Sequence, residues 1–467
     1  MNPSRRHFLK TASIVAAGFG GLQNFAAERS KKDLKKLQAK GYGPLIKDPA
    51  GVIDLPEGFT YTTFSKWRDK MDDGLLVPTK HDGMGAFPGP NGLTILVRNH
   101  ENSPARSGDL GAFGPGHRLM KQEHLDMMYD QGTKVGDILR IPCLGGTTTI
   151  VYDTKKQKMV RHFLSLAGTI RNCAGGNTPW NSWITSEEST ERAGNRLSKD
   201  HGYNFEVPAT ITPKLADPIP LKAMGRFNHE AVAVDPKTGI VYQTEDQGDS
   251  LIYRFIPDVP EQLAKGGKLQ ALVVNDKKGL DTRNWFKPTV RTGDEFKVSW
   301  VDIEDVESPK DDLREQGYAK GAARFARGEV MWYGHNSIYF AATNGGEKQR
   351  GQIWRLNLGE NDNISMDLFA MPDEQALVDM ADNLTVSPYG GLILCEDGPG
   401  EQYLRGVTTE GKFFNFAKNR VLPYQEGRPD PEFCGATFSP DGSTLFVNIQ
   451  YPGITLAITG PWKTLKS

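Results

Sequence analysis

Six segments of this sequence repeat one pattern, in which a turn rich in Gly, Pro, Asn or Asp precedes a short apolar run with a polar or acidic end. A turn followed by such a run is typical of a β-hairpin. A single segment would also fit a β-sandwich, but six in one chain favour a radial repeat of small sheets. The segments are FPGPNGLTILVRNHE (87–101), GNTPWNSWITSEE (176–188), VDPKTGIVYQTED (234–246), WYGHNSIYFAATNGG (332–346), SPYGGLILCED (387–397) and SPDGSTLFVNIQ (439–450).

The repeats predict an all-β fold, a six-bladed β-propeller with long loop insertions and a few short helices. We expect each repeated segment to supply the inner strand of one blade, and outer strands to follow at 251–257, 352–358 and 403–416. Because the segments are irregularly spaced, the insertions are expected in the loops. Helical periodicity is confined to 119–129 and 309–325.

The charge balance excludes nucleic acid as a partner. The 467 residues include 56 Lys and Arg against 57 Asp and Glu, so the formal net charge is -1 and there is no basic field to hold a nucleic-acid backbone. The 51 Gly and 29 Pro fit a fold with many turns better than a helix bundle.

The N-terminus carries the pattern of an export signal. The string SRRHFLK (4–10) precedes a weakly apolar run, which is the address read by the bacterial Tat system, and this run is too short and Gly-rich to span a membrane. We predict a Tat signal peptide over 1–27, a polar linker over 28–47 and a single propeller domain over 48–467. No clean A-x-A cleavage motif is present, so a cut near residue 26 or 27 is only inferred. We expect a periplasmic or secreted monomer without a stable membrane span, which meets the Tat translocase during export.

The four cysteines show no C-x-x-C spacing. An oxidising periplasm would permit disulfides, and a Cys143–Cys434 or a Cys395–Cys434 bridge is open on sequence grounds. Cys173 lies in RNCAGGNTPWNSWITSEE (171–188), where a soft thiolate precedes two carboxylates and the segment could serve a mixed metal site. The alternative is a buried Cys packed under a tight turn.

Side-chain alternation separates the two acids of that segment. If 180–185 is extended, only one of Glu187 and Glu188 can share a face with Trp183, so one carboxylate points inward and its neighbour points away.

Acids gather where the predicted strands end. Converging carboxylates repel one another and need cations, for which oxygen ligands suit Ca²⁺ and the Cys173 thiolate suits a transition metal. A nearby cation, Arg327, would hold an anionic substrate. With no G-x-S-x-G and no Walker sequence, this set points to hydrolysis by a metal-activated oxygen. The polar strand ends are Asn99, His100, Glu101, Glu187, Glu188, Glu245, Asp246, Thr343, Asn344, Glu396, Asp397, Asn448 and Gln450, and Glu230, Glu329, Asp382 and Asn383 precede strands.

With these residues in view, the chain resembles the PhoX-type alkaline phosphatases, which are Tat-exported bacterial enzymes. The resemblance runs from about 51 to 462 and includes the strings N-C-A-G-G-x-T-P-W, W-x-T-x-E-E, G-R-F-x-H-E-A, R-x-E, D-N-L-x-V-S-P and C-E-D-G. It implies a six-bladed propeller that holds two irons and three calciums around a bridging oxygen and hydrolyses phosphate monoesters.

The resemblance also implies roles for single residues. Cys173 would be the thiolate shared by the irons, with Glu188, Glu230 and Glu329 as carboxylate ligands. Arg327 would clamp the phosphate, and with Cys173 it forms the predicted catalytic pair. Ser186 stands where the family often has Cys. The implied calcium ligands are Glu187, Glu245, Asp246, Asp382, Asn383, Glu396 and Asp397.

The leading prediction is therefore an exported alkaline phosphatase-like phosphomonoesterase, in which a metal-held oxygen attacks a phosphate ester. One alternative is a calcium-dependent propeller phosphodiesterase or lactonase, which would not need Cys173. A second is a non-catalytic, calcium-bound binding propeller, which would not need Arg327 beside a metal.

Overall fold

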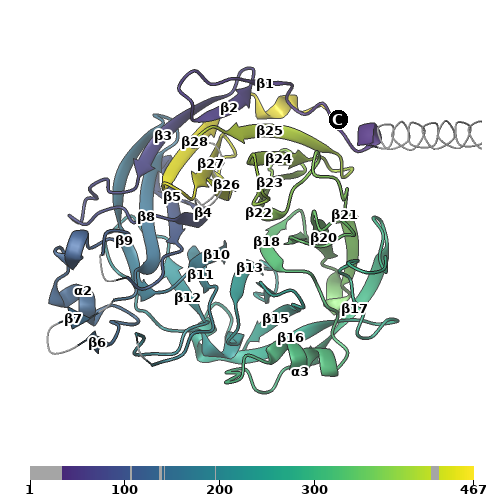
Figure 1. The fold of residues 1–467 in the computed structure, drawn as a ribbon, viewed down its shortest axis with the longest axis horizontal. Coiled ribbons are helices and arrows are strands. Elements are labelled where there is room, and N and C mark those ends of the chain that lie inside the picture. The colour runs from purple at the N-terminus through teal and green to yellow at the C-terminus, as the bar shows by residue number, and fades with distance from the viewer. Residues whose placement is uncertain are drawn as a thin grey trace, which may run out of the picture.

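The computed structural model describes residues 34–105, 108–135, 139–140, 142–194, 196–421 and 431–466. Within these residues the chain forms antiparallel sheets arranged around a common centre, as in a propeller (Figure 1). The predicted signal peptide and the first residues of the predicted linker lie outside the described residues. No described helix is both long and apolar enough to cross a membrane.

Most sheets are meanders of strands that follow one another in sequence. In hydrogen-bonding order they are β4 (His81–Pro88), β5 (Thr94–His100), β8 (Gly145–Asp153) and β9 (Lys158–Thr169); β10 (Asn172–Asn177), β11 (Ser182–Glu187) and β12 (Asn204–Pro208); β26 (Phe433–Phe438), β27 (Thr444–Ile449), β28 (Ile454–Thr459) and β3 (Thr60–Lys66); β1 (Leu45–Ile46), β2 (Ile53–Pro56), β25 (Phe413–Asn419), β24 (Tyr403–Val407), β23 (Leu392–Glu396) and β22 (Ala381–Val386); and β6 (Lys134–Val135) with β7 (Leu139–Arg140).

A nine-stranded sheet joins two further meanders edge to edge. The last strands of the two meanders pair, with Glu295 opposite Asp367. The hydrogen-bonded sheets therefore confirm an all-β, propeller-like fold without dividing it into equal blades. The first meander holds β13 (His229–Val234), β14 (Val241–Glu245), β15 (Ile252–Pro257), β16 (Gly267–Val274) and β17 (Glu295–Asp302), and the second holds β18 (Gly328–Gly334), β19 (Ser337–Ala342), β20 (Gln352–Asn357) and β21 (Ser365–Ala370).

Helices are few and short, as predicted. The helical patterns over 119–129 and 309–325 yield only the short helices α2 (Gln122–Asp126) and α3 (Leu313–Ala319). The 3-10 helices are η1 (Pro90–Gly92), η2 (Pro115–His117), η3 (Lys222–Met224), η4 (Leu263–Lys265), η5 (Glu360–Asp362) and η6 (Trp462–Thr464).

The innermost strands form a closed ring, in which β4, β10, β13, β18, β22 and β26 each pack against the next (Figure 1). The six repeated sequence segments supply the strands after these: β5, β11, β14, β19, β23 and β27. The prediction that those segments form the inner strands is therefore wrong, because they form the second strand of each meander. The predicted outer strands begin with the third strands β15, β20 and β24.

Close packing at the centre explains this difference. A Cβ on Gly83 of β4 would lie 2.6 Å from the Ala174 Cα of β10, and one on Gly176 would lie 2.0 Å from the Val232 carbonyl oxygen of β13. Strands β4 and β10 thus approach their neighbours through glycine, which leaves no room at these positions for the apolar side chains that mark a strand in sequence.

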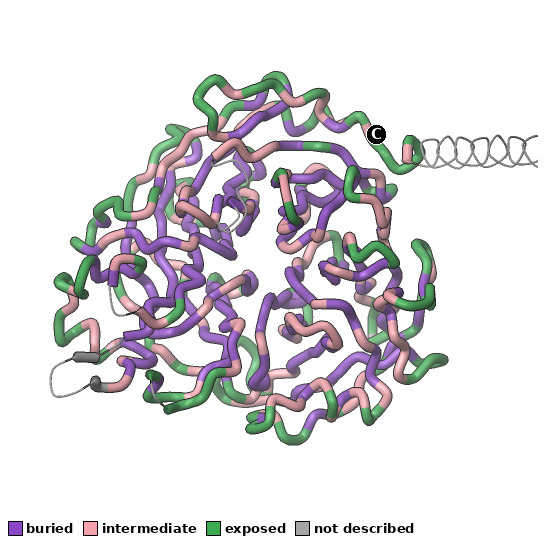
Figure 2. Tube along the Cα trace, in the orientation of Figure 1, coloured by how far each residue is buried: buried purple, intermediate pink, exposed green. Residues whose placement is uncertain are grey.

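The two ends of the described chain close the ring. Strand β3 pairs with β28, from Thr60 opposite Thr459 to Lys66 opposite Ile454, so an N-terminal strand completes the C-terminal sheet. Strand β2 likewise adds to β25. Figure 2 shows the buried trace concentrated in the strands, with exposed residues in the peripheral loops.

All four cysteines are free thiols, so neither possible disulfide is formed. Cys143 packs with Ile170 and Leu197, whereas the Cys434 Sγ lies 2.9 Å from the His81 carbonyl oxygen. The thiols thus fill separate positions in the packing.

We predict that Trp462→Ala opens the closure. The Trp462 ring lies 4.8 Å from the Phe59 ring and 5.2 Å from the Phe416 ring, so it links both ends of the chain. Removing a buried Trp should lower the free energy of unfolding by about 3–5 kcal/mol. Urea unfolding measures this, and Ile219→Ala, at a side chain that is 53% exposed, should change little. Equal stability of the two variants would contradict the closure role.

Candidate metal centre

One position repeats at the start of the inner strands. All six of these strands have an acid or a thiol as their second residue: Asp82, Cys173, Glu230, Glu329, Asp382 and Cys434. The register of each of the six inner strands shifts near its start, as in a β-bulge. Bulges re-aim side chains next to functional sites, so the repeated irregularity turns these groups toward one end of the ring.

A repeated backbone hydrogen bond brings the second strands to the same end. In each sheet, one residue directly follows the second strand, and its backbone N–H donates to a backbone carbonyl oxygen. That carbonyl belongs to the residue two positions before the acid or thiol of the inner strand. The six donor and acceptor pairs are Glu101 to Lys80 at 3.0 Å, Glu188 to Arg171 at 2.9 Å, Asp246 to Asn228 at 3.1 Å, Thr343 to Arg327 at 3.0 Å, Asp397 to Met380 at 3.0 Å and Gln450 to Glu432 at 3.1 Å.

The bulges and the repeated hydrogen bond bring together a group of residues that we call the acidic cluster. It consists of Asp82, Glu101, Cys173, Glu188, Glu230, Asp246, Glu329, Asp382, Asp397 and Glu432. Its members lie within electrostatic reach of one another. Seven of the residues predicted from sequence as metal ligands are in it: Cys173, Glu188, Glu230, Asp246, Glu329, Asp382 and Asp397.

Cys173, Glu188 and Glu230 make the tightest part of the cluster. One ligand atom from each lies within 4.8 Å of the others, which is a spacing that a single ion could bridge. Burial raises the pKa of the Cys173 thiol well above its ordinary value, and the charges of Asp82 and Glu230 raise it further. The Cys173 Sγ lies 3.8 Å from a carboxylate oxygen of Asp82.

Arg327 lies between two acids of the cluster. Its Nε donates to Asp246 Oδ1 at 2.8 Å, and its Nη2 lies 2.7 Å from Glu329 Oε1. Arg327 adopts a left-handed conformation with φ of 50°, which a non-glycine residue adopts at a cost when the surrounding structure holds it. The guanidinium is thus fixed next to the acids, with its side chain 32% exposed.

The pKa values show that the cluster is complementary to cations. Burial raises the pKa of Glu188 to about 8 and that of Asp382 to about 7, with further contributions from Glu101 and Asp397. Burial and the neighbouring acids also raise the pKa of Glu230 and Glu329 well above the ordinary range. Glu230 Oε2 has no hydrogen-bond partner among the described residues. Unpartnered buried oxygens beside a thiol fit metal ions that bind both oxygen and sulfur.

Sequence reasoning missed two members of the cluster, Asp82 and Glu432. Burial raises the pKa of both carboxyls, with repulsion from Glu101 at Asp82 and from Asp397 at Glu432. Asp82 follows the first residue of β4, HDGMGAFP, a strand without an apolar run to mark it. Asp82 could have been found from its position, because β4 is the strand that forms a hairpin with the repeated segment 87–101.

Four predicted calcium ligands lie on other faces or have their own protein partners. Glu187 accepts bonds from His201 and Gly202, Glu245 from Tyr253 at 2.9 Å, and Glu396 from Arg405 at 2.7 Å. These three are the last residues of β11, β14 and β23, and each stands one position before a member of the cluster. Side-chain alternation therefore turns them away from the cluster. Asn383 follows Asp382 in β22 and is buried. Glu245 Oε1 and Glu396 Oε2 have no hydrogen-bond partner within the described part of the chain.

His201 holds Glu187 in place on the side away from the cluster. Its Nδ1 lies 2.6 Å from Glu187 Oε1 and its Nε2 lies 3.2 Å from Asp130 Oδ2, with all three side chains fully buried. Burial lowers the pKa of His201, but the two carboxylates outweigh it and raise the pKa to about 12. His201 is therefore an imidazolium that holds Glu187, and with it the strand end at Glu188. The opposite directions of these two acids agree with the alternation predicted from sequence.

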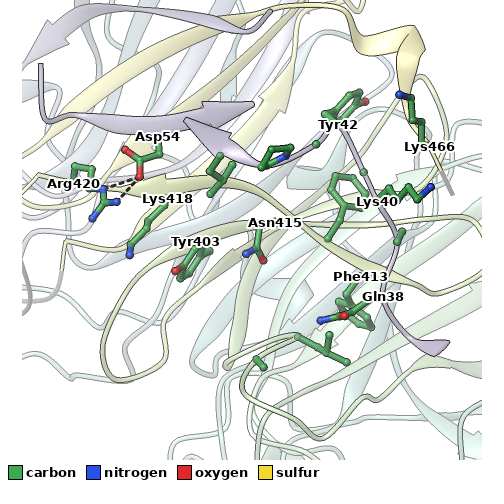
Figure 3. Close-up of a pocket in the computed structure, with 18 residues that line it drawn as sticks. Gln38, Lys40, Tyr42, Asp54, Tyr403, Phe413, Asn415, Lys418, Arg420 and Lys466 are labelled. Atoms are coloured by element: carbon green, nitrogen blue, oxygen red, sulfur yellow. Dashed lines mark hydrogen bonds and ion pairs between the residues drawn. The ribbon is translucent and has the colours of Figure 1, made fainter. Parts of the chain in front are cut away.

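A cavity of about 720 Å³ lies elsewhere, between the N-terminal residues 38–45 and strands β24 and β25 (Figure 3). Lys40, Tyr403 and Lys418 line it, and Asp54 pairs with Arg420 at its edge. None of its lining residues belongs to the acidic cluster. The cavity and the acidic cluster are therefore separate features of the fold.

We predict that His201→Asn destabilises the protein by about 3–5 kcal/mol, because it leaves two buried carboxylates without their cation. The folded pKa of His201 exceeds its ordinary 6.5, so this stabilisation is complete below pH 6.5 and is lost as the pH rises toward 12. Unfolding curves across this range measure the difference from wild type. The exposed His335→Asn is the control, and a pH-independent difference would contradict the charged state.

The comparisons with known proteins agree with this geometry. The family model described as alkaline phosphatase PhoX matches residues 40–453. No curated protein sequence matches this chain. The structure of Pseudomonas fluorescens PhoX in complex with vanadate, a transition state analogue, superposes with a TM-score of 0.63 at 18% identity, covering 91% of this chain and 98% of that one. At this identity the likeness shows the fold.

Other solved structures match more weakly. A luciferin-regenerating enzyme gives a TM-score of 0.40 at 10% identity over 88% of this chain and 97% of its own. A gluconolactonase of Xanthomonas campestris gives 0.33 at 11% identity over 82% and 97%. Neither value carries an argument about function. Because the family model spans most of the chain, this protein belongs to the alkaline phosphatase PhoX family.

Proposed function

We propose that the protein is a metal-dependent phosphomonoesterase that releases phosphate from organic phosphate esters. The observation that carries this proposal is the Cys173, Glu188 and Glu230 triad in one acidic cluster with the Arg327 guanidinium, within a family of alkaline phosphatases. A thiolate and carboxylates bind metal ions, and a fixed guanidinium binds a phosphate dianion.

The proposed architecture is a six-bladed propeller. The closed ring of inner strands and the six equivalent backbone hydrogen bonds support six repeats. On this view the nine-stranded sheet is two blades that pair through their outermost strands, β17 and β21. The six inner strands then converge on one catalytic centre.

The proposed metals are two irons and three calciums. Cys173, Glu188, Glu230 and Glu329 would hold the irons, because a thiolate favours a transition metal over calcium. Asp246, Asp382 and Asp397 would hold calcium, joined by Asp82. Bound ions supply positive charge that offsets the acids, polarises the phosphate and lowers the pKa of an attacking water.

Roles also follow for the remaining predicted ligands. Glu396 keeps one buried oxygen without a hydrogen-bond partner among the described residues, and Asn383 lies next to Asp382. Glu245 Oε1 lies 3.5 Å from the Arg314 guanidinium, so a calcium there would share this oxygen with Arg314. Glu187 has its oxygens occupied by protein donors, so we assign it a supporting role through His201.

Arg327 binds and orients the phosphate in this proposal. Asp246 and Glu329 hold its Nε and Nη2, which fixes the plane of the guanidinium before substrate arrives. Its exposed part then donates to phosphoryl oxygens and stabilises the negative charge that develops there. Cys173 has no role as a nucleophile in this scheme and serves as a ligand.

Export by the Tat system to the periplasm or beyond, as a monomer, remains part of the proposal. It is supported by the SRRHFLK string and by the family, and Tat transport of folded protein would suit a chain that takes up metals before export.

We predict that Arg327→Ala lowers kcat/KM for p-nitrophenyl phosphate by about 10²–10³, and that Arg327→Lys recovers part of the loss. Arg355 offers a matched control, because it pairs with Asp367 through the same atoms at 3.0 Å and is also 32% exposed. Arg355→Ala should keep wild-type activity. Equal activity of the two alanine variants would rule out the phosphate role of Arg327.

We predict that Cys173→Ser loses iron, keeps calcium and loses phosphatase activity. Metal analysis by ICP-MS on protein purified without chelator, with Cys395→Ala as the thiol control, measures this. Calcium alone in wild type with no phosphatase activity would instead favour a calcium-dependent phosphodiesterase or lactonase, or a binding propeller. Full activity in Cys173→Ser would likewise contradict the iron site.

A further inference from the structure

Two other cations occupy the position that corresponds to Arg327, directly before another inner strand. Lys80 and Arg171 each stand two residues before the repeated acid or thiol, as Arg327 does. All three adopt a left-handed conformation, with φ of 48°, 45° and 50°. Each also accepts the repeated backbone hydrogen bond, from Glu101, Glu188 and Thr343 in turn. The fold therefore presents Lys80 and Arg171 at the same end of the ring as Arg327.

Lys80 and Arg171 converge on a single carboxylate. The Lys80 Nζ lies 3.1 Å from Glu101 Oε2, and the Arg171 Nε lies 3.2 Å from Glu101 Oε1. Their strands, β4 and β10, pack side by side in the ring. The Arg171 Nη2 also lies 2.5 Å from Glu188 Oε2. A cation, an acid and a second cation thus form a continuous string beside the metal triad.

This string keeps a positive charge when the metal centre is assembled. Two cations share Glu101, while Glu188 belongs to the triad with Cys173 and Glu230. The side chains of Lys80 and Arg171 are 40% and 39% exposed, against 11% for Glu101. The cations therefore face solvent while the acid between them is covered. A lysine ammonium has three N–H donors and an arginine guanidinium has five, so both can donate outward while paired.

We propose that Lys80 and Arg171 form a second anion-binding site next to the reaction centre. It binds a second phosphate carried by the leaving group, so the enzyme favours doubly phosphorylated esters over monophosphates. This inference rests on the proposed phosphomonoesterase activity and extends it to a substrate class. Arg327 immediately precedes β18, which is separated from β10 by β13 in the ring, so the two anionic groups of one substrate would bind at separate places.

The test compares fructose 1,6-bisphosphate with fructose 6-phosphate. In wild-type holoenzyme the ratio of their kcat/KM values should exceed the statistical advantage of carrying two phosphates. Lys80→Gln should lower this ratio by about tenfold, the effect of one charge pair in a partly exposed site. Lys156→Gln is the matched control, because Lys156 also pairs with an acid, Asp153, at 3.1 Å but lies in the turn between β8 and β9. It should keep the wild-type ratio.

The outcomes separate this inference from the proposed function. If wild type hydrolyses neither ester, the phosphomonoesterase proposal fails. If it hydrolyses both and Lys80→Gln keeps the wild-type ratio, the second site is overturned and the activity stands. A second measurement needs only the wild-type protein and so does not depend on the folding of a variant. Propane-1,3-diphosphonate should inhibit about tenfold more tightly than propylphosphonate. Equal inhibition by the two compounds would also overturn the second site.

Discussion

Buried acids that repel one another dominate the electrostatics at the centre of this structure. Burial and neighbouring charges raise the pKa of Asp82, Glu230, Glu329 and Glu432 together. In its ionised form such a cluster needs cations to offset its charge, and the chain supplies a few at its edge, with Arg327 set between Asp246 and Glu329. The remaining charge balance falls to metal ions. In the proposed function, these ions and Arg327 would supply the positive charge that binds a substrate phosphate.

The propeller-like fold lets regular strands build this cluster. Inner strands that approach through Gly83 and Gly176 lie close enough for their first residues to share one site. The bulge near each strand start and the repeated hydrogen bond aim the side chains without using a loop. Closure by β3 on β28 and by Trp462 on Phe59 prevents the ring from opening. Positioning therefore comes from the strands and from the residues directly at their ends, which the strands hold more rigidly than a long loop would.

The sequence predicts the second strands and their acids well, since apolar runs such as LTILV and GLILC are visible in it. Side-chain alternation along a strand also suffices to place Glu187 and Glu188 on opposite sides. The inner strands β4 and β10 are not predictable in this way, because glycines stand where apolar residues would mark a strand, and Asp82 is hidden in β4. The anchoring of Glu187 by His201 and Asp130 depends on contacts between distant segments that no local pattern records.

If the proposed function is right, the Cys173, Glu188 and Glu230 triad holds iron within a cluster that also holds calcium. Anomalous diffraction at the iron edge, from crystals of protein purified without chelator, tests it most directly. We expect iron peaks in contact with Cys173 Sγ and the Glu230 carboxylate, and calcium near Asp246 and Asp382. Calcium alone at the triad, or iron bound elsewhere in the molecule, would contradict it.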